Sequence, residues 1–282
     1  MTLPADAVNA ANEKSRRLRE LLHAPEILIL PGAFNVLSAL LYQHLGFPAI
    51  QGSSAGFANA LGYADLGIDR ETTVKVTKLC ASAVTVPVNA DGEDGWGGPD
   101  EVRKSVRALV EAGAAGMNME DRQRHGDLVP ITYQVEKIAA FMEERKALGS
   151  EFLLNARVDA FITMRDDPGA ALKEAVKRGQ AYAKAGADSV FFFGVSDKAH
   201  IATLVKEVPA PVSVLAAPGV PSARELEELG VARVSYGSMF LRVAVGAVKK
   251  AALEVKEQKT HALMDDAISG AEIAAILGSR AE

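Results

Sequence analysis

The sequence contains a single cysteine, Cys80, among its 282 residues. One cysteine cannot form an intramolecular disulfide bond, and it cannot supply a zinc site built from several cysteines. Histidine is scarce as well, since the five histidines do not cluster at zinc-ligand spacings. These shortages exclude a disulfide-stabilised framework and argue against a zinc enzyme.

Long apolar runs and basic tracts are also missing. No apolar run approaches the roughly 18 residues of a membrane-spanning helix, and the N-terminus lacks the basic-then-apolar pattern of a signal peptide. The formal net charge is −5, and nothing in the charge pattern is typical of a nucleic-acid-binding surface. We therefore expect a cytoplasmic protein without nucleic-acid or membrane partners. A hydrophobic fraction of 49% is ample for a core.

Short apolar segments alternate with longer amphipathic ones along the chain. The apolar segments are nearly continuous in Val, Ile, Leu and Phe, which is typical of strands covered on both faces. The eight predicted strands are 27–32, 49–53, 86–90, 116–120, 152–157, 189–194, 212–217 and 233–237. Glycines that suit the left-handed end of a helix precede four of them: Gly46, Gly113, Gly186 and Gly230. Their spacing fits multiples of a βα unit of about 35 residues.

This alternation predicts an α/β protein with a (β/α)₈ TIM-type barrel. A doubly wound open sheet is the alternative, but no G-x-G-x-x-G motif follows the first strand. The expected organisation is an N-terminal helical extension (1–24), a barrel (25–257) and a C-terminal helical extension (258–282). The last segment carries an apolar helix after the barrel is complete, and that face must be buried somewhere. We therefore predict that it contacts a neighbouring subunit in a homo-oligomer, with folding back on its own barrel as the alternative.

Acidic residues crowd the ends of the predicted strands. The stretch VPVNADGEDGWGG (86–98) runs from a buried strand into Asp91 and Glu93, while Glu120 ends the next strand and Asp65 follows the second. In such barrels the C-terminal strand ends form the active site. Unpaired carboxylates there would raise one another's pKa, and a hard divalent cation relieves this. Mg²⁺, with Mn²⁺ as an alternative, takes oxygen ligands and keeps several waters, so only one or two carboxylates need touch it.

Two further residues are candidates for binding a substrate. Arg157, at the end of the fifth strand, offers a fork for a substrate carboxylate. Trp96 is the only tryptophan, and its position fits either a pocket wall or the core.

Four motifs carry a resemblance to a known family. GSSAGFANALGYADLG (52–67), VNADGEDGWG (88–97), GAAGMNMED (113–121) and LNARVDAF (154–161), in this order, resemble the isocitrate lyase/phosphoenolpyruvate mutase superfamily. The resemblance extends from about residue 25 to about residue 250. It implies an α/β barrel that holds Mg²⁺ near a 2-oxo acid and makes or breaks a C–C or C–P bond beside an enolpyruvate-like intermediate.

The resemblance also implies roles for individual residues. Asp91 would touch the metal, whose waters would be held by Asp65, Glu93 and Glu120. Ser53 and Ser54 would contact the substrate carboxylate or enolate, and Arg157 would bind the substrate. Because family members commonly exchange a C-terminal helix between barrels, the resemblance further implies a dimer of dimers.

The sequence departs from the family in the segment after the fourth strand. The lyase branch has a lid with K-x-C-G-H there, whose cysteine is an acid/base, whereas EDRQRHGDLVP (120–130) contains His125 and no cysteine. Glu93 also replaces an aspartate, a change that a water-mediated role tolerates. The sixth strand ends in Phe-Phe-Phe-Gly, where lyases usually have a glutamate. These changes argue against cleavage of isocitrate or methylisocitrate and leave His125 as the candidate acid/base.

The sequence therefore predicts a Mg²⁺-dependent enzyme that acts on a small 2-oxo or 2-hydroxy carboxylic acid, with C–C lyase chemistry as the first choice. One alternative is C–P chemistry, by a phosphonomutase, a carboxyphosphonoenolpyruvate mutase-like enzyme or a phosphonopyruvate hydrolase. A second is a non-catalytic barrel that binds an oxo acid. Gly219 and Gly237, after the last two strands, also fit an unrelated phosphate-binding barrel, which would not explain the acidic residues.

Overall fold

A computed structural model describes residues 3–124, 126–258 and 261–281. Its centre is a parallel sheet in the order β1-β9-β8-β7-β6-β5-β4-β3-β2. The strands are β1 Leu28–Leu30, β2 Gly32–Ala33, β3 Ile50–Gly52, β4 Val88–Asp91, β5 Gly116–Glu120, β6 Leu153–Val158, β7 Ser189–Phe192, β8 Val212–Leu215 and β9 Arg233–Ser235.

The sheet closes through a single interrupted segment. β1 pairs with β9 and β2 pairs with β3, and only Pro31 separates β1 from β2. Proline has no backbone N–H to donate to a neighbouring strand, although the Pro31 carbonyl accepts a hydrogen bond from the Gln51 amide at 3.0 Å. With β1 and β2 counted as one strand, the fold is the predicted eight-stranded α/β barrel.

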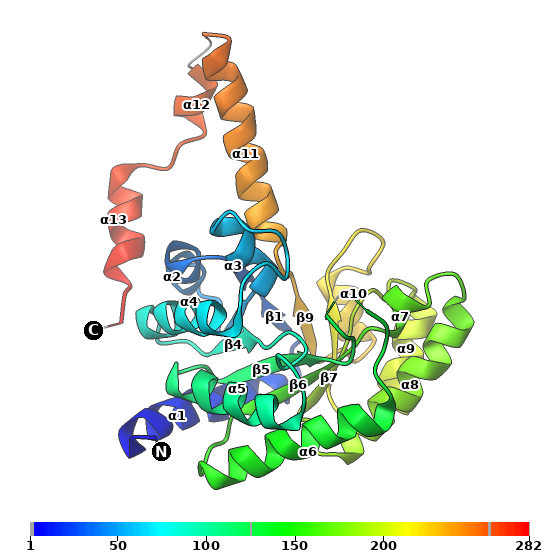
Figure 1. The fold of residues 1–282 in the computed structure, drawn as a ribbon. Helices are drawn as coiled ribbons and strands as arrows, with labels where there is room; N and C mark the ends of the chain where they lie inside the picture. The colour runs from blue at the N-terminus through cyan, green and yellow to red at the C-terminus, as the bar shows by residue number, and fades with distance from the viewer. Residues whose placement is uncertain (1–2, 125, 259–260, 282) are drawn as a thin grey trace.

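Helices follow the strands and cover the outside of the barrel (Figure 1). They are α2 Val36–His44, α3 Ser54–Ala60, α4 Arg70–Ala83, α5 Pro99–Glu111, α6 Ile131–Ala147, α7 Ala160–Thr163, α8 Pro168–Lys184, α9 Lys198–Glu207 and α10 Ala223–Glu228. Among them, α5 and α8 begin at a proline. The missing N–H of proline costs nothing there, because an N–H in the first turn has no partner within the helix. Cys80 is buried in α4, as expected of a core residue.

The predicted helix-to-strand glycines adopt the left-handed conformation. Gly113 has φ +79° and Gly186 has φ +105°, and Gly46 and Gly230 lie in the same region. A residue with a Cβ is strained at such angles, so these glycines allow the chain to turn directly into the next strand.

The first helix, α1 (Ala5–Leu22), packs at the N-terminal end of the barrel. Its residues Leu18 and Leu22 are buried in a cluster with Leu28 and Leu153. The buried Ser15 hydroxyl donates to the Ala115 carbonyl at 2.9 Å. The predicted N-terminal extension therefore leaves the opposite end of the barrel open.

The C-terminal helices form an arm that rises from the barrel (Figure 1). The arm consists of α11 (Met239–Lys256), α12 (His261–Asp265) and α13 (Gly270–Gly278). Within the single chain, α13 returns to α2 and α4: Ile276 is buried, and the Ala281 amide donates to the Ala83 carbonyl at 2.9 Å. Helix exchange with a second subunit stays a prediction. Among the described residues, no helix combines the length and apolar character needed to cross a membrane.

Candidate active site

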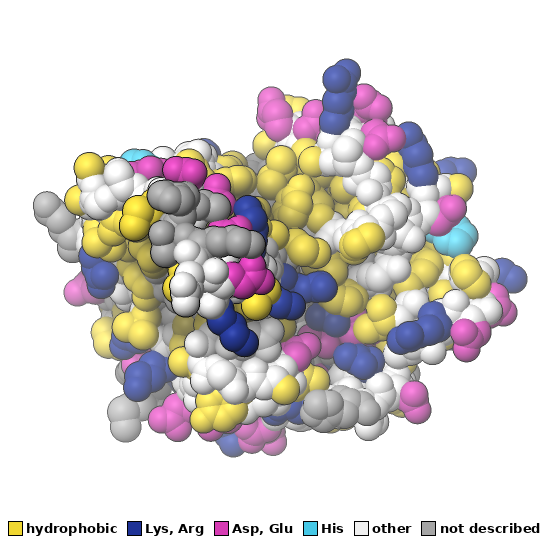
Figure 2. Space-filling model, turned by 90° about the horizontal axis from the view of Figure 1, so that it is seen from above, with side chains coloured by type: hydrophobic (Ala, Val, Ile, Leu, Met, Phe, Trp, Pro, Cys, Tyr) yellow, Lys and Arg dark blue, Asp and Glu magenta, His cyan; other side chains and the backbone are white. Residues whose placement is uncertain are grey.

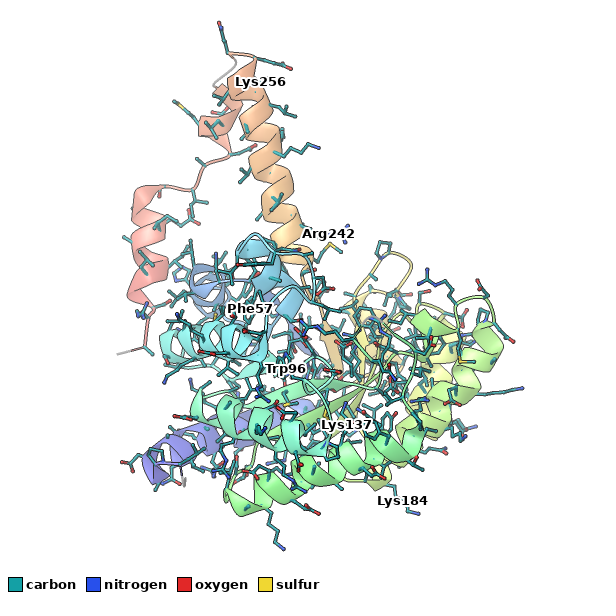
Figure 3. The ribbon with its side chains drawn as sticks, in the orientation of Figure 1. Phe57, Trp96, Lys137, Lys184, Arg242 and Lys256 are labelled. Carbon is teal, nitrogen blue, oxygen red and sulfur yellow. The ribbon has the colours of Figure 1, made fainter. Side chains whose placement is uncertain are left out.

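A cavity of about 290 Å³ opens at the C-terminal ends of the strands. Its lining includes Gln51, Ser53, Ser54, Asp65, Asp91, Asn118, Glu120, Arg122, Arg157, Phe193, Ser235, Tyr236 and Arg242. The face from which the arm rises carries Lys and Arg side chains near its centre, beside the arm (Figure 2). Arg242 lies where α11 leaves the barrel (Figure 3).

The Asp91 carboxylate is held in place by the start of α3. Its Oδ2 atom accepts hydrogen bonds from the Ser54 hydroxyl at 2.8 Å and from the Ser54 amide at 3.2 Å. The Ser53 hydroxyl instead caps α3, because it accepts a hydrogen bond from the Gly56 amide at 3.1 Å. Of the two predicted substrate-binding serines, Ser54 therefore orients the acid and Ser53 orders the helix.

Glu93 is a buried carboxylate without hydrogen bonds. Its side chain is 1% exposed and both oxygens lack a hydrogen-bond donor among the described residues. Burial and the neighbouring charge of Asp91 raise the pKa of Glu93 to about 7, against which Arg124, 3.5 Å away, acts. Its backbone has φ +45°, an unusual conformation for a residue with a side chain. Such strain and missing hydrogen bonds are expected at a functional site rather than in a structural core.

The Arg157 guanidinium is largely engaged within the protein. It forms a fork with Asp159, with its Nε and one terminal nitrogen 2.6 and 3.1 Å from the two carboxylate oxygens. Its other terminal nitrogen donates to Glu120 at 2.8 Å, and the guanidinium carbon Cζ lies 3.8 Å from the centre of the Phe193 ring. Three of the five N–H groups are thus used, which leaves one on each terminal nitrogen for a ligand. The fork itself faces Asp159, and the predicted contact of Arg157 with a substrate carboxylate stays a prediction.

Charge compensation in this cluster is incomplete. Burial raises the pKa of Glu120 above its usual range, although the contact with Arg157 opposes the shift. Burial also acts against the charged form of Arg157, but Glu120 and Asp159 outweigh it and raise its pKa. The Arg157 side chain therefore stays protonated and supplies a permanent positive charge at the cavity wall.

A second buried cluster supports this wall from behind. Asp121 accepts hydrogen bonds from Arg178 at 3.0 Å and from the Tyr182 hydroxyl at 2.8 Å, both on α8. Its other oxygen accepts from the Asp159 amide at 2.9 Å. β5, β6 and α8 are thus joined directly behind Arg157.

The remaining predicted site residues have different positions. Asp65 lines the cavity from the loop after α3 and is exposed. Trp96 is half-buried and is not among the residues that line the cavity, so the structure does not bring it to the site. His125 lies outside the described residues.

The four predicted metal-site acids share one region. Asp65 and Asp91 line the cavity together with Glu120, and Glu93 lies close enough to Asp65 and Asp91 for their charges to affect its pKa. Within the described part of the chain, no three Asp, Glu, His or Cys side chains converge tightly enough to ligate one ion directly. The arrangement fits a hydrated Mg²⁺ that is touched by one or two carboxylates, because the unbonded oxygens of Glu93 can accept from its waters.

Several cavity residues were not predicted as ligand contacts. Asn118 shares β5 with Glu120, Arg122 donates to Asp159 at 3.2 Å, and Tyr236 follows β9. Their positions at or just beyond strand ends are the one signal that could have found them. Arg242 carries no such signal, since it lies within a helix.

Known proteins are similar to this chain in both sequence and fold. A sequence model of the family described as phosphoenolpyruvate phosphomutase matches residues 18–256. The chain belongs to the isocitrate lyase/phosphoenolpyruvate mutase superfamily. The 2-methylisocitrate lyase of Bacillus subtilis is 30% identical over 86% of this chain and 81% of that protein.

Solved structures of superfamily members superpose over most of the chain. Phosphoenolpyruvate phosphomutase from Streptomyces platensis subsp. rosaceus has a TM-score of 0.83 and 28% identity, and covers 94% of this chain and 95% of its own. Phosphonopyruvate hydrolase in complex with oxalate and Mg²⁺ has a TM-score of 0.83 and 30% identity, with the same coverage. The superfamily thus includes enzymes of both C–C and C–P chemistry.

Proposed function

We propose that this protein is a Mg²⁺-dependent enzyme that acts on a small 2-oxo or 2-hydroxy carboxylic acid and makes or breaks a C–C bond through an enolpyruvate-like intermediate. The observation that carries the proposal is that Asp91, oriented by Ser54, lies near the buried Glu93, whose carboxylate accepts no hydrogen bond from the described residues. Arg157 supplies the opposite charge in the same cavity.

Asp91 would touch the cation, and Asp65, Glu93 and Glu120 would accept hydrogen bonds from its waters. When bound, Mg²⁺ would polarise the carbonyl of the oxo acid and stabilise negative charge on the enolate. Ser53 and Ser54 would contact the substrate carboxylate or enolate through their side chains, since their backbone amides already donate to Ala33 and Asp91.

The free N–H groups of Arg157 would bind the substrate carboxylate. Each of its terminal nitrogens retains one proton after the contacts with Asp159 and Glu120, so the guanidinium can bridge protein and substrate. Stacking on Phe193 and the Asp159 fork hold its plane fixed, which limits the entropy lost when a carboxylate binds.

His125, in the segment between β5 and α6, is the proposed acid/base. In the sequence it falls in the segment in which the lyase branch carries a catalytic cysteine, as the resemblance to the superfamily implies. His125→Ala is expected to lower kcat while leaving the affinity for a non-reacting analogue unchanged. An unchanged kcat would remove it from the mechanism.

C–P chemistry is the second candidate. It is favoured by the match to the phosphoenolpyruvate phosphomutase family over residues 18–256 and by the likeness to phosphonopyruvate hydrolase. The same enolate site serves both chemistries, so the carboxylates and Arg157 would keep their roles.

We also propose that the chain forms a homo-oligomer, most simply a dimer of dimers, through the C-terminal arm. Along α11 the side chains of Val243, Val245 and Val248 are 63, 57 and 68% exposed, and Met264 in α12 is 72% exposed. A run of exposed apolar side chains on one projecting arm marks a contact surface.

A ligand panel tests the function. Thermal unfolding would be measured with Mn²⁺ or Mg²⁺ in combination with oxalate, pyruvate, oxaloacetate and phosphonopyruvate, and products would be followed by ¹H and ³¹P NMR. Stabilisation that requires metal and oxo acid together, with C–C turnover, is expected. Turnover of the phosphonate alone would establish the second candidate. Binding without turnover would indicate a sensor, and no stabilisation by any pair would refute the proposal.

A further inference from the structure

A buried arginine that forms no ion pair among the described residues contacts two residues of the cavity wall. Arg233, at the start of β9, is 2% exposed and points into the barrel interior, where its side chain meets Gln51 and Asn118. Within the described part of the chain Arg233 forms no ion pair, and the acid whose charge acts on it is Asp91. Burying an unpaired charge costs several kcal/mol, so an isolated arginine at this position requires a reason.

Arg233 determines how two cavity amides are oriented. One terminal nitrogen lies 2.5 Å from Gln51 Oε1 and 3.2 Å from Asn118 Oδ1. Because a guanidinium can only donate hydrogen bonds, the atoms that face it must be the amide oxygens. The choice between the two amide orientations, which is often ambiguous, is thus fixed by chemistry.

The neighbouring asparagines reinforce this orientation. Asn118 Oδ1 also accepts from Asn89 Nδ2 at 3.0 Å and from Asn155 Nδ2 at 2.8 Å. Asn155 is itself oriented by Ser189, whose hydroxyl donates to its oxygen at 2.6 Å. Three donors therefore converge on one oxygen, and reversing the Asn118 amide would break all three bonds.

The Asn118 amide nitrogen is left facing the ligand space. Within the described part of the chain it has no acceptor, and it is not among the fully buried polar atoms that lack partners. Asn118 lines the cavity, where its backbone is in register with Asp91 on one side and Asn155 on the other. Two N–H bonds with a fixed direction thus lie beside the proposed metal acid.

We propose that Asn118 Nδ2 donates a hydrogen bond to an anionic oxygen of the bound oxo acid. Arg233 is then the positioning residue that fixes the direction of this donor from the far side of the barrel. The proposal rests on the proposed function, since it needs an anion in this cavity. The buried charge of Arg233 adds positive potential under the same oxygen, and the bound anion would offset the cost of burying that charge.

The geometry separates Arg233 from the metal site. Its contacts are to amides, whereas its effect on Asp91 is through charge alone. Removing the positive charge should therefore leave cation affinity unchanged or higher, while the affinity for an anion falls. General damage to the barrel would weaken both.

The test measures oxalate and Mn²⁺ binding separately by titration calorimetry. In Arg233→Gln the Kd for oxalate at saturating Mn²⁺ should rise at least tenfold, with the Kd for Mn²⁺ alone unchanged or lower. Arg233→Lys, which keeps the charge but cannot bridge both amides, should give an intermediate loss. Asn118→Asp keeps an oxygen for the three donors and replaces the nitrogen by an acceptor. Its Kd for oxalate should therefore rise at least as much as that of Arg233→Gln.

Ser213→Ala is the matched control. Ser213 is in register with Arg233 on β8 and is buried, but its hydroxyl has no hydrogen-bond partner among the described residues and it does not line the cavity. This variant should bind oxalate as the wild type does. The double variant Arg233→Gln/Asn118→Asp should bind oxalate no more weakly than the more severely affected single variant, because both substitutions remove the same donor.

Each outcome has a defined meaning. If the wild type binds oxalate and the Arg233 and Asn118 variants bind it within twofold of the wild type, the inference is wrong while the proposed function stands. If the wild type binds neither oxalate nor any other oxo acid of the panel with Mn²⁺, both fall. Circular dichroism checks folding, and if Arg233→Gln does not fold, Arg233→Lys and Asn118→Asp decide the question.

Discussion

Ser54 donates two hydrogen bonds to Asp91, one from its hydroxyl at 2.8 Å and one from its backbone amide at 3.2 Å. The start of α3 thereby fixes the direction of a carboxylate at the end of β4. A carboxylate that is held in one orientation can bind a cation without first losing side-chain freedom, so Asp91 is the acid whose removal should matter most.

Asp91→Ala should abolish Mn²⁺ binding, or weaken it at least about a hundredfold, because the oriented ligand is gone. The fold should remain, since Asp91 lies at the cavity and not in the apolar core. Titration calorimetry with Mn²⁺ measures the effect. Asp100→Asn, at a carboxylate whose side chain is 95% exposed on α5, is the control and should bind like the wild type. Unchanged affinity in Asp91→Ala would remove it from the metal site.

Arg157→Lys should raise the Kd for oxalate in the presence of Mn²⁺ by at least about tenfold. A lysine ammonium cannot contact Glu120, bridge both oxygens of Asp159 and still present a planar pair of donors to a ligand. Arg103→Lys, where the arginine pairs with Glu143 on the surface at 2.6 Å, provides the comparison. Equal oxalate binding by Arg157→Lys and the wild type would assign Arg157 a structural role only.

Glu93→Gln should stabilise the metal-free protein as pH rises. The pKa of Glu93 in the fold is about 7, above its ordinary 4.5, so the folded state disfavours the ionised form. This penalty is absent below pH 4.5, grows up to about pH 7 and is constant above it. The shift from 4.5 to about 7 corresponds to about 3 kcal/mol, so at pH 8 the variant should gain stability of this order and several degrees in Tm.

Thermal unfolding in EDTA at pH 5 and pH 8 measures this difference. Glu111→Gln, at an exposed position that ends α5, should show no pH-dependent gain. An equal Tm difference between Glu93→Gln and wild type at the two pH values would mean that Glu93 is not a buried charge.

Replacing Val245 and Val248 together by aspartate should dissociate the proposed oligomer, because charges would enter an apolar contact. Light scattering should then give the mass of one chain, 29.8 kDa, where the wild type gives a multiple. Lys249→Gln, on the same helix, should keep the wild-type mass. A monomeric wild type, or an unchanged mass in the valine variant, would contradict the proposal for the arm.

The barrel could be predicted because its signals are local and repeated. A βα unit is recognisable from a continuous apolar segment and from a glycine, such as Gly113 or Gly186, where the helix turns into the strand. Few other residue types adopt the positive φ that this turn requires. The positions of Asp91 and Glu120 followed, since strand ends in a barrel meet at one mouth.

The contacts of Arg157 and Arg233 could not be predicted in the same way. Asp159 stands only two residues after Arg157, which gives no indication that the two side chains form a fork. Arg233 begins the short strand β9 and contacts Asn118, 115 residues earlier, so the pairing arises only when the barrel closes. The C-terminal extension is predicted by the sequence, but α11 is assigned to the barrel because its amphipathic pattern is that of helices that lie on a barrel.

Asp121 accepts hydrogen bonds from Arg178, Tyr182 and the Asp159 amide at once, so the wall that carries Arg157 is joined to α8 as well as to Arg122, which donates to Asp159. Beyond Arg122, no described side chain of residues 123–129 forms a hydrogen bond or ion pair with Arg157 or Asp159, so substitutions there can accumulate without moving the arginine. Homologous chains would diverge in activity mainly by changing that short segment, and a laboratory search for new substrates would do best to randomise it and leave the Asp121 cluster intact.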